Sequence, residues 1–486
     1  MRNKTIYFIL FFLLSSCGIL LPASNSLKTN QNNALKYSKI ITQKDLKKHL
    51  KIISSDEFEG RETTTIGQKK AANYIKNHFI KNNVKSPYGD TGYLQSFPVD
   101  VLDFSNVDFS YNGTKFTFIK DFYTYGNPIK SVYNNVPVID VGYGISSFQK
   151  NEYLGINVKG KAVVLKDGIP NGTIEKKEGN WRKKVRTAKK EGAIAVIFRK
   201  ENYSDTDLKI KKHLQYPIMK MHGNQKAKPQ IPVFIVDSEK LKELNTKQNK
   251  TSFNTSISQE KSGENVLGFI PGITDEIIVV SAHYDHIGYD MGEICNGADD
   301  DGSGTSSLLS ISKAFQTAFE EGKKPQRGIL FLAVSGEEKG LFGSQFYTEN
   351  PAFPLSKTVA DLNIDMVGRK DTIQQDNNYI YLIGSDRISK ELHIINEKIN
   401  KKHIGFKLDY TYNAKDDPNN FYQRSDHYNF AKNNIPVIFY FGGLHEDYHQ
   451  PTDDFEKIDF LKLERVSRFV FLTAWELAYR KKTLSK

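Results

Sequence analysis

Residues Glu276 to Ser303 read EIIVVSAHYDHIGYDMGEICNGADDDGS and decide the fold of this 486-residue chain. The Ile and Val run at the start predicts a buried strand, because such runs are typical of parallel sheets covered on both faces. His283, Asp285 and the triplet Asp299–Asp301 follow it, and helical spacing begins at Ser303. The stretch predicts a strand, a polar loop and a helix of an α/β domain, with candidate ligands where such sheets bind them.

Alternating strands and helices continue on either side of this stretch. Apolar runs predict further strands at residues 264–270, 328–336, 359–367, 378–384 and 435–443. Helical spacing predicts helices at residues 303–321, 341–348, 389–401 and 460–479. We therefore expect an α/β fold with a mixed, largely parallel sheet flanked by helices.

Residues able to bind a metal ion follow these predicted strands. His283 and Asp285 lie two positions apart, so their side chains face the same side of an extended segment. His283 could bind a metal ion while Asp285 accepts its second ring proton. The carboxylates of Asp299–Asp301 repel one another unless water or a cation screens them. An ordinary polar strand end and an acidic helix start are the readings without metal.

Glu337 and Glu338 end the next predicted strand. Because neighbouring side chains diverge, one carboxylate could bind a metal ion while the other faces the reacting water. That division of labour suits metal-assisted hydrolysis, in which the metal ion lowers the pKa of water and a free carboxylate moves the proton. A solvent-exposed turn is the alternative.

Two more segments extend the candidate set. Asp365 lies within an apolar strand, where an unpaired charge is costly, so it needs a metal ion or Arg369 as partner. A loop marked by Gly and Pro offers His445 and His449, and its chemistry does not choose between them. Mixed nitrogen and oxygen ligands without thiolates favour zinc over cobalt or manganese. One bridging carboxylate would make a two-metal hydrolase site.

Five motifs together resemble the family-28 zinc metallopeptidases: SAHYDHIG (281–288), NGADDDGSG (296–304), SGEEKGLFGS (335–344), NIDMVG (363–368) and YHQPTDD (448–454). The resemblance begins near Ile41, includes DEFEGRETTTIGQKKAANYI (56–75) and reaches the C-terminal helix. The family contains dizinc aminopeptidases, glutamate carboxypeptidase-like enzymes and glutaminyl cyclases. The resemblance implies a zinc aminopeptidase-like three-layer fold and two Zn²⁺ per chain.

The resemblance also implies a role for each matching residue. Five residues match the family's metal ligands: His283, Asp300, Glu338, Asp365 and His449. Asp300 would bridge the two ions, with His283 and Asp365 on one side and Glu338 and His449 on the other. The family pattern thereby selects His449 over His445.

Further matches concern catalysis and substrate. Glu337 would be the general base and acid, and Asp285 would support His283 from behind. Ser425, Asp426 and His427 resemble a family stretch near the substrate pocket, so we expect them to bind substrate.

Between residues 101 and 262 the sequence changes to short β-rich runs broken by Gly, Asn and Pro. GKAVVLKDG (160–168), a helix before GAIAVIF (192–198) and IPVFIVDS (231–238) resemble, in that order, a protease-associated domain. Such domains resemble substrate-access lids or interaction modules. We expect this insertion to separate an N-terminal part of the catalytic domain, residues 38–100, from its main part, residues 263–486.

The N-terminus resembles a bacterial export signal. Arg2 and Lys4 precede an apolar run and the string LSSC, which resembles a lipobox ending at Cys17. We expect a signal peptide over residues 1–16, a lipid on Cys17, a polar tether over residues 17–37 and a protein anchored to a membrane of the bacterial cell envelope. An ordinary signal peptide with an incidental cysteine is the alternative. The second cysteine, Cys295, then has no partner, so no disulfide framework is expected.

Composition narrows the class of protein. Hydrophobic residues make up 38% and aromatic residues 12% of the chain, which excludes a disordered or fibrous protein. The net charge is +12, and the excess is mostly lysine scattered through polar segments. Nucleic-acid readers favour arginine forks, so we expect no nucleic-acid partner.

The combined reading is an exported dizinc exopeptidase that acts on peptides. We expect an aminopeptidase that removes N-terminal residues through a zinc-bound hydroxide, with Glu337 as general base. The alternatives on the same scaffold are a glutaminyl cyclase using one zinc ion and a carboxypeptidase acting on acidic dipeptides. A non-catalytic surface binding protein with a structural metal site is the alternative from a different class.

Overall fold

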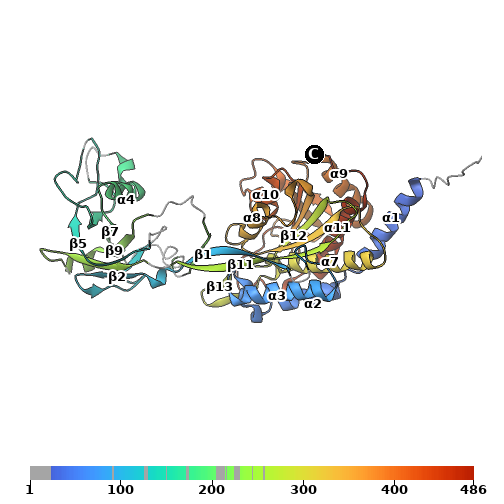
Figure 1. Ribbon diagram of the computed structural model, residues 1–486, viewed down its shortest axis with the longest axis horizontal. Helices are drawn as coiled ribbons and strands as arrows, with labels where there is room; N and C mark the ends of the chain where they lie inside the picture. The colour runs from blue at the N-terminus through green and yellow to red at the C-terminus, as the bar shows by residue number, and fades with distance from the viewer. Residues whose placement is uncertain are drawn as a thin grey trace, which may run out of the picture.

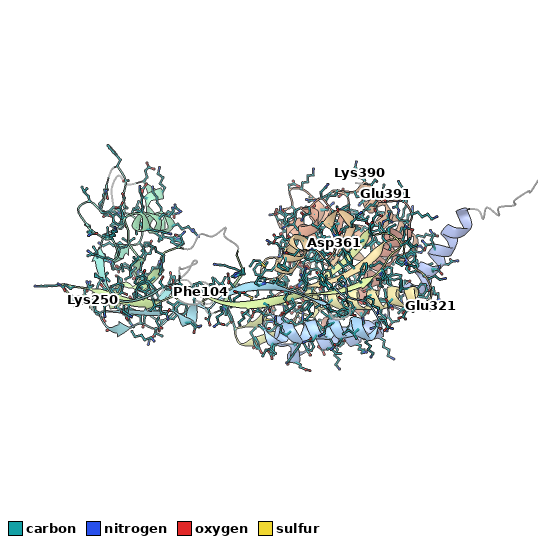
Figure 2. The ribbon with its side chains drawn as sticks, in the orientation of Figure 1. Phe104, Lys250, Glu321, Asp361, Lys390 and Glu391 are labelled. Carbon is teal, nitrogen blue, oxygen red and sulfur yellow. The ribbon has the colours of Figure 1, made fainter. Side chains whose placement is uncertain are left out.

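Two long antiparallel strands, β1 (Leu94–Leu102) and β11 (Ser258–Ile270), connect the two parts of the chain in this computed structural model (Figure 1). They pair from Leu94 opposite Val266 to Leu102 opposite Ser258. In Figure 2, Phe104 and Lys250 belong to the smaller body and Asp361 to the larger one.

The structure describes residues 23–89, 92–124, 130–148, 150–170, 175–203, 214, 216–223, 230–243, 245–255 and 258–485. The expected signal peptide and Cys17 lie outside these residues. Within them, no helix combines the length and the apolar character that crossing a membrane requires.

The larger body is built on one mixed sheet. Among the described residues it has nine strands, in the order β18-β17-β19-β16-β12-β15-β11-β1-β8. The bounds of the seven not yet given are β8 (Ile218–Met221), β12 (Ile277–His283), β15 (Gly328–Val334), β16 (Thr358–Asp365), β17 (Tyr379–Ile383), β18 (Lys407–Asp409) and β19 (Val437–Phe441). The central strands β15, β12, β16 and β19 run parallel, whereas β11 and β17 are antiparallel to their inner neighbours. The expected mixed, largely parallel sheet is confirmed.

Helices bury both faces of this sheet. One face packs against α2 (Gln43–Ile53), α3 (Ile66–Lys81), α7 (Gly304–Glu320), α9 (Lys390–Ile399) and α11 (Phe460–Tyr479). The other packs against α8 (Phe342–Glu349) and α10 (His427–Ala431). Successive residues of β12 alternate between the two cores, with Ile278 and Val280 in the first and Ile277 and Val279 in the second. Burial on both faces explains why this strand is a continuous apolar run.

Side chains that accept backbone hydrogen bonds fix where several helices begin. Thr42, Thr65, Ser389 and Asp459 cap α2, α3, α9 and α11, and each accepts a hydrogen bond from an N–H of the first turn. Such caps satisfy donors that a helix start leaves unpaired.

The expected tether over residues 17–37 needs a correction in its second half. Residues Ala23–Ser38 form the helix α1, which Figure 1 shows beside α11. Ala34 and Tyr37 lie three positions apart on one face of α1 and are buried. The Tyr37 ring stacks on Trp475 of α11 with 5.6 Å between ring centroids. Because the segment is mostly polar, its composition did not indicate that these two side chains pack against the domain.

The insertion forms a second sheet with its own core. Among the described residues its eight strands are ordered β3-β2-β10-β5-β6-β7-β9-β4. Their bounds are β2 (Asp108–Tyr111), β3 (Thr114–Lys115), β4 (Phe122–Thr124), β5 (Val132–Asp140), β6 (Ala162–Lys166), β7 (Ala195–Lys200), β9 (Val233–Asp237) and β10 (Lys250–Asn254). The helices α4 (Trp181–Lys190) and α6 (Ser238–Glu243) contribute buried side chains to the core of this sheet. Although β8 lies within residues 101–262, it pairs with β1 in the larger sheet. The domain boundaries themselves stay a prediction.

Candidate metal centre

The expected ligands meet at one edge of the larger sheet. His283 is the last residue of β12, Asp365 is the last residue of β16, and Glu338 follows the end of β15. Asp300 comes from the loop that leads into α7, and His449 from the loop after β19. Because β15, β12 and β16 are adjacent and parallel, their carboxyl ends bring these side chains together.

One group of donors surrounds His283. Its Nε2 atom lies 3.3 Å from Asp300 Oδ1 and 3.5 Å from Asp365 Oδ1. The other oxygen of Asp365 accepts a hydrogen bond from Ser425 Oγ at 2.7 Å, which fixes the carboxylate. These three donors form one of two candidate metal-binding groups in the described part of the chain.

The second group shares Asp300. Its Oδ2 atom lies 3.3 Å from His449 Nε2 and 3.7 Å from His286 Nδ1. The compact group consists of His286, Asp300 and Glu338, whose Oε1 lies 2.9 Å from His286 Nδ1. The expected ligand His449 lies next to this group, with Nε2 3.0 Å from Glu338 Oε2, but is not a member of it. Asp300 thus directs one oxygen to each group, which is the arrangement a bridging carboxylate requires.

The donor set fits two metal ions. Donors about 2.1 Å from a tetrahedral zinc ion stand about 3.4 Å apart, close to the spacings observed here. His286 Nδ1, Glu338 Oε1 and His449 Nε2 are buried and make no hydrogen bond, although oppositely charged partners are near. Buried polar atoms without partners are uncommon in native proteins, and a cation in each group would satisfy these.

Electrostatics within the site favour positive charge. Burial opposes a charged imidazole, but the closeness of Asp300 and Glu338 raises the pKa of His449 to about 10. Burial likewise opposes ionisation of His283, yet Asp365, Asp285 and Asp300 raise its pKa well above its usual range. The carboxylates therefore stabilise a cation at two adjoining points, and metal ions can take the place of the ring protons.

Glu337 lies beside both groups without belonging to either. Burial raises the pKa of its carboxyl well above its usual range; His283 opposes this shift, and Glu338 and Asp365 add to it. The backbone N–H of Glu337 donates to Asp285 Oδ1 at 3.3 Å. Glu337 is therefore a free, desolvated carboxyl group within reach of the metal centre.

Asp285 supports the site differently from the expected way. His283 Nδ1 donates to the main-chain oxygen of Asp285 at 3.1 Å, whereas the carboxylate Oδ1 lies 3.7 Å away. The expected ring hydrogen bond to the carboxylate is thus replaced by one to the backbone, which still leaves Nε2 free for a metal ion. The carboxylate instead accepts hydrogen bonds from Thr63 Oγ1 and Glu337 N.

Other candidates of the sequence stand outside the two groups. Asp299 accepts from Gly368 N, and Asp301 accepts from Gly304 N and Met366 N, so two of the three aspartates order the backbone. His445 Nε2 lies 3.3 Å from Asp299 Oδ2 and joins neither group.

The possible cation partner of Asp365 on its own strand also has a different contact. Arg369 forms an ion pair with Asp447, so it does not pair with Asp365. Within the described residues, His283 is the basic side chain paired with Asp365.

A small cavity of about 30 Å³ opens beside Asp300, Glu337 and Asp365. Its wall combines the apolar and aromatic side chains of Met366, Phe421, Phe439, Phe441, Leu444 and Tyr448 with the polar side chains of Arg424 and Ser425. Of the three residues expected to bind substrate, Ser425 lines this cavity, but Asp426 and His427 do not. Asp426 is fully buried and accepts a hydrogen bond from Ser344, and the His427 ring stacks on Phe439. Both lie behind the wall because they follow Ser425 into α10.

Sequence reasoning missed two residues of the site. His286 follows the motif pair His283 and Asp285 and was assigned no role. Arg61, in the quoted DEFEGR piece, is fully buried and donates to four main-chain oxygens: those of Ile53, Tyr284, Asn296 and Gly297. The position of Arg61 within the family motif was the one signal in the sequence that could have singled it out. The sequence does not reveal which main-chain oxygens accept its hydrogen bonds.

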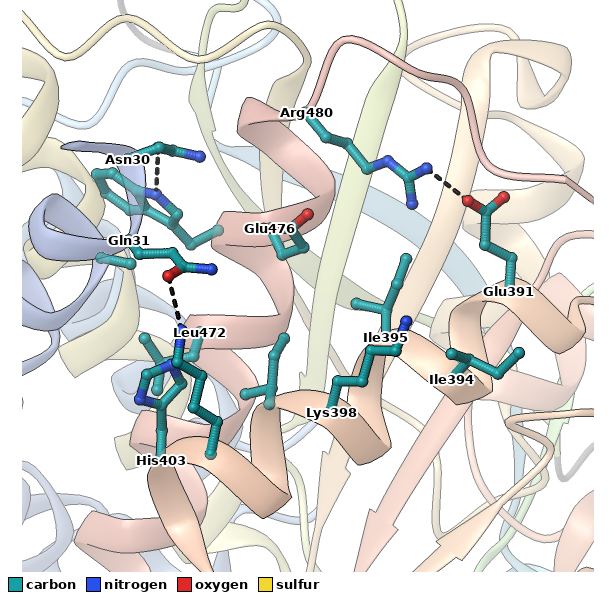
Figure 3. A pocket seen from close by; sticks show the side chains of 14 residues that line it. Asn30, Gln31, Glu391, Ile394, Ile395, Lys398, His403, Leu472, Glu476 and Arg480 are labelled. Atoms are coloured by element: carbon teal, nitrogen blue, oxygen red, sulfur yellow. Dashed lines mark hydrogen bonds and ion pairs between the residues drawn. The ribbon is translucent and has the colours of Figure 1, made fainter. Parts of the chain in front are cut away.

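A larger cavity lies away from this chemistry. It measures about 370 Å³ and is lined by α1, α9 and α11 (Figure 3). Its walls include ion pairs and hydrogen bonds such as Arg480 with Glu391 and Lys402 with Gln31. None of the metal-binding groups found in the described residues borders it.

The fold and the site together define a class: an α/β domain with a mixed, largely parallel sheet, at whose strand ends acidic and imidazole side chains form two candidate metal-binding groups. Residues 265–474 match the model of peptidase family M28, and residues 131–244 match that of the PA domain. Residues 265–474 therefore form a peptidase family M28 domain and the insertion contains a PA domain, which confirms the resemblance seen in the sequence.

Relatives and solved structures agree with this assignment. The chain is 24% identical over 366 residues to Aminopeptidase YwaD of Bacillus subtilis (strain 168), covering 71% of this chain and 68% of that protein. It is 30% identical over 222 residues to a probable leucine aminopeptidase of Arthroderma benhamiae, covering 44% of this chain and 57% of the relative.

Two solved structures share the fold. An aminopeptidase from Aneurinibacillus sp. strain AM-1 gives a TM-score of 0.55 at 19% identity, covering 93% of this chain and 98% of that one. A zinc aminopeptidase from Bacillus subtilis gives a TM-score of 0.52 at 20% identity, covering 92% and 98%. The zinc aminopeptidase-like fold is thereby confirmed.

Proposed function

We propose that this enzyme is an aminopeptidase that holds two zinc ions and removes N-terminal residues from peptides. One observation carries the proposal: two donor groups share Asp300, and the carboxyl group of Glu337 lies beside both. His283 and Asp365 would hold one ion, Glu338 and His449 the other, and Asp300 both. The names of the matched relatives support the choice of aminopeptidase.

The chain's own residues divide the work of hydrolysis. When bound, zinc polarises a substrate carbonyl and lowers the pKa of water. Glu337 accepts the proton of the attacking water and passes it to the leaving amine. Asp285, held by Thr63, positions the Glu337 backbone and the His283 ring.

Glu337→Gln tests this function directly. The variant keeps the shape of the side chain but cannot take a proton, so we expect a loss of about 10²–10⁴-fold in kcat on aminoacyl-p-nitroanilides. Its zinc content, measured by atomic emission, should stay near two per chain. Glu338→Gln is the matched comparison, and it should lose zinc as well as activity.

The same assay separates the rival reactions on this scaffold. Acetylating the substrate's amino terminus should abolish cleavage by an aminopeptidase, whereas cleavage of blocked acidic dipeptides would indicate a carboxypeptidase. Cyclisation of N-terminal glutamine with one zinc ion per chain would indicate a cyclase. Unchanged hydrolysis by Glu337→Gln would remove Glu337 from the mechanism.

We further propose that the enzyme is exported and anchored through a lipid on Cys17. The charged start, the short apolar run and LSSC support this proposal. In an expression host with lipoprotein processing, the wild type should incorporate labelled palmitate and sediment with membranes. Cys17→Ser should lose the label, and equal labelling of both proteins would contradict a lipid at this position.

A further inference from the structure

We propose that His286 is a sixth protein ligand of the dinuclear centre and coordinates the second zinc ion through Nδ1. The inference rests on the proposed dinuclear function and adds a residue to it. The second position would then have two imidazoles and two carboxylates, from His286, His449, Glu338 and Asp300. The first would have one imidazole and two carboxylates.

The first support is the geometry around the ring. His286 Nδ1 lies 2.9 Å from Glu338 Oε1 and 3.7 Å from Asp300 Oδ2. Two donors about 2.1 Å from one ion stand about 3.0 Å apart at right angles and about 3.4 Å apart in a tetrahedron, so both distances suit a shared ion. With Asp300 and Glu338, His286 forms one of the two compact donor groups among the described residues.

The second support is the absence of any other partner for this donor. The His286 side chain is fully buried, and neither ring nitrogen makes a hydrogen bond within the described structure. Glu338 Oε1 is also without a hydrogen bond, although His286 Nδ1 is its near neighbour. A simple hydrogen bond between them would need an alignment that the two groups lack. One cation satisfies both atoms where they stand.

The third support is a space in the backbone that fits the ring. Gly297 has a φ of 54°, and a Cβ atom there would lie 2.5 Å from His286 Cγ. Only glycine therefore allows the imidazole to stand against this loop. Arg61 holds the same loop by donating to Gly297 O at 2.9 Å. The ring is thus placed by its surroundings before any ion binds.

The extra ligand predicts an order of metal binding. Because the second position has one more imidazole donor, it should bind zinc more tightly and fill first. The two ions should therefore differ in affinity, with the weaker ion at His283 and Asp365.

A structure of the zinc-loaded wild-type enzyme tests the proposal without any variant. His286 Nδ1 should lie within about 2.3 Å of the second ion, the bonding distance for imidazole and zinc. A distance above about 3 Å with both ions present would overturn the proposal while leaving the proposed function intact. A wild type that binds fewer than two zinc ions would instead count against the proposed function.

Metal affinity in solution gives an independent test. In His286→Gln, a side-chain amide can still donate to Glu338 but does not replace the imidazole ligand. Zinc affinity of the tighter site, measured by chelator competition, should fall at least about 100-fold, beyond the usual effect of an outer-shell partner. His78→Gln, a buried imidazole exchange far from the site, is the matched control and should leave that affinity unchanged. Equal affinity in folded His286→Gln and wild type would contradict the proposal.

Discussion

At the scale of single residues, one buried arginine connects the N-terminal segment with the metal centre. Arg61 is fully buried, and within the described part of the chain its guanidinium donates to main-chain oxygens only. Tyr284 lies beside His283, and Asn296 and Gly297 begin the loop that carries Asp300. Burial lowers the pKa of Arg61 to about 10, although Asp285 and Asp300 oppose the shift. The residue therefore stays charged at neutral pH and joins two ligand-bearing segments.

Arg61→Lys should loosen both segments at once. Lysine keeps the charge but cannot present the planar fork that reaches four acceptors. We expect a loss of about 2–4 kcal/mol in unfolding free energy, measured by urea denaturation. Zinc affinity should fall by about tenfold or more, because the ligand loops lose their positioning.

Arg468→Lys provides the comparison for this prediction. Arg468 also donates to a main-chain oxygen, that of Ile41, but its side chain is partly exposed. Its replacement should cost less than about 1 kcal/mol and leave zinc affinity unchanged. If Arg61→Lys behaved like Arg468→Lys, the positioning role would be wrong.

At the scale of elements, α2 and α3 meet through two buried imidazoles. His49 of α2 and His78 of α3 stand edge to face with 4.7 Å between ring centroids. His78 Nε2 donates to Leu309 O of α7 at 3.0 Å. Burial, aided by the neighbouring His49, lowers the pKa of His78 to about 3. Burial also lowers the pKa of His49 to about 4, so both rings are neutral in the folded protein at pH 7.

This pair should make the helix layer sensitive to acid. Between pH about 6.5 and 3 the unfolded chain binds a proton that folded His78 does not, so stability falls as pH falls. From pH 7 to pH 4 the loss from this residue is about 3 kcal/mol. In metal-free protein, His78→Gln should lose correspondingly less unfolding free energy over that range. The Asp100 carboxylate raises the pKa of the exposed His222, so replacing His222 should not lessen the fall. An equally steep fall in His78→Gln would refute the prediction.

At the scale of the whole molecule, the strand pair β1 and β11 and the short strand β8 connect the insertion with the larger body. The two sheets have separate hydrophobic cores, and β1 and β11 pair without interruption up to Leu102 and Ser258. Every candidate metal ligand lies in the larger body. The catalytic domain therefore has the contacts to fold without the insertion.

Replacing residues 103–257 with Asn-Gly should close β1 and β11 into a hairpin, since this dipeptide favours the required turn. The shortened enzyme should bind two zinc ions, and its kcat/KM on a small aminoacyl amide should stay within about tenfold. Loss of β8 uncovers one sheet edge, so we expect Tm to fall by several degrees. A folded variant that bound no zinc would show that the insertion helps to build the site.

Much of the fold was predictable because its signals are local. The apolar run of β12 and the helical spacing of apolar residues in α7 and α11 show which side chains of each element are buried. These patterns lie within single elements, so they can be recognised without knowing the tertiary structure. The prediction of a tether was wrong over α1 because this helix packs on the domain through two buried side chains, which are too few to change its polar composition. The hydrogen bond from His283 to the Asp285 backbone depends on how the chain turns after the strand, which residue types do not reveal.

The amino-acid sequence by itself determined the order of strands and helices and supplied the imidazoles and carboxylates at strand ends, since periodicity and motif spacing are properties of short segments. Tertiary structure alone decided that His286 faces Glu338, that Arg61 reaches the loop before Asp300, and that Asp426 and His427 lie behind the cavity wall. These contacts join residues far apart in the chain, or depend on the direction of a side chain at a loop, so they exist only once the sheet has brought the loops together.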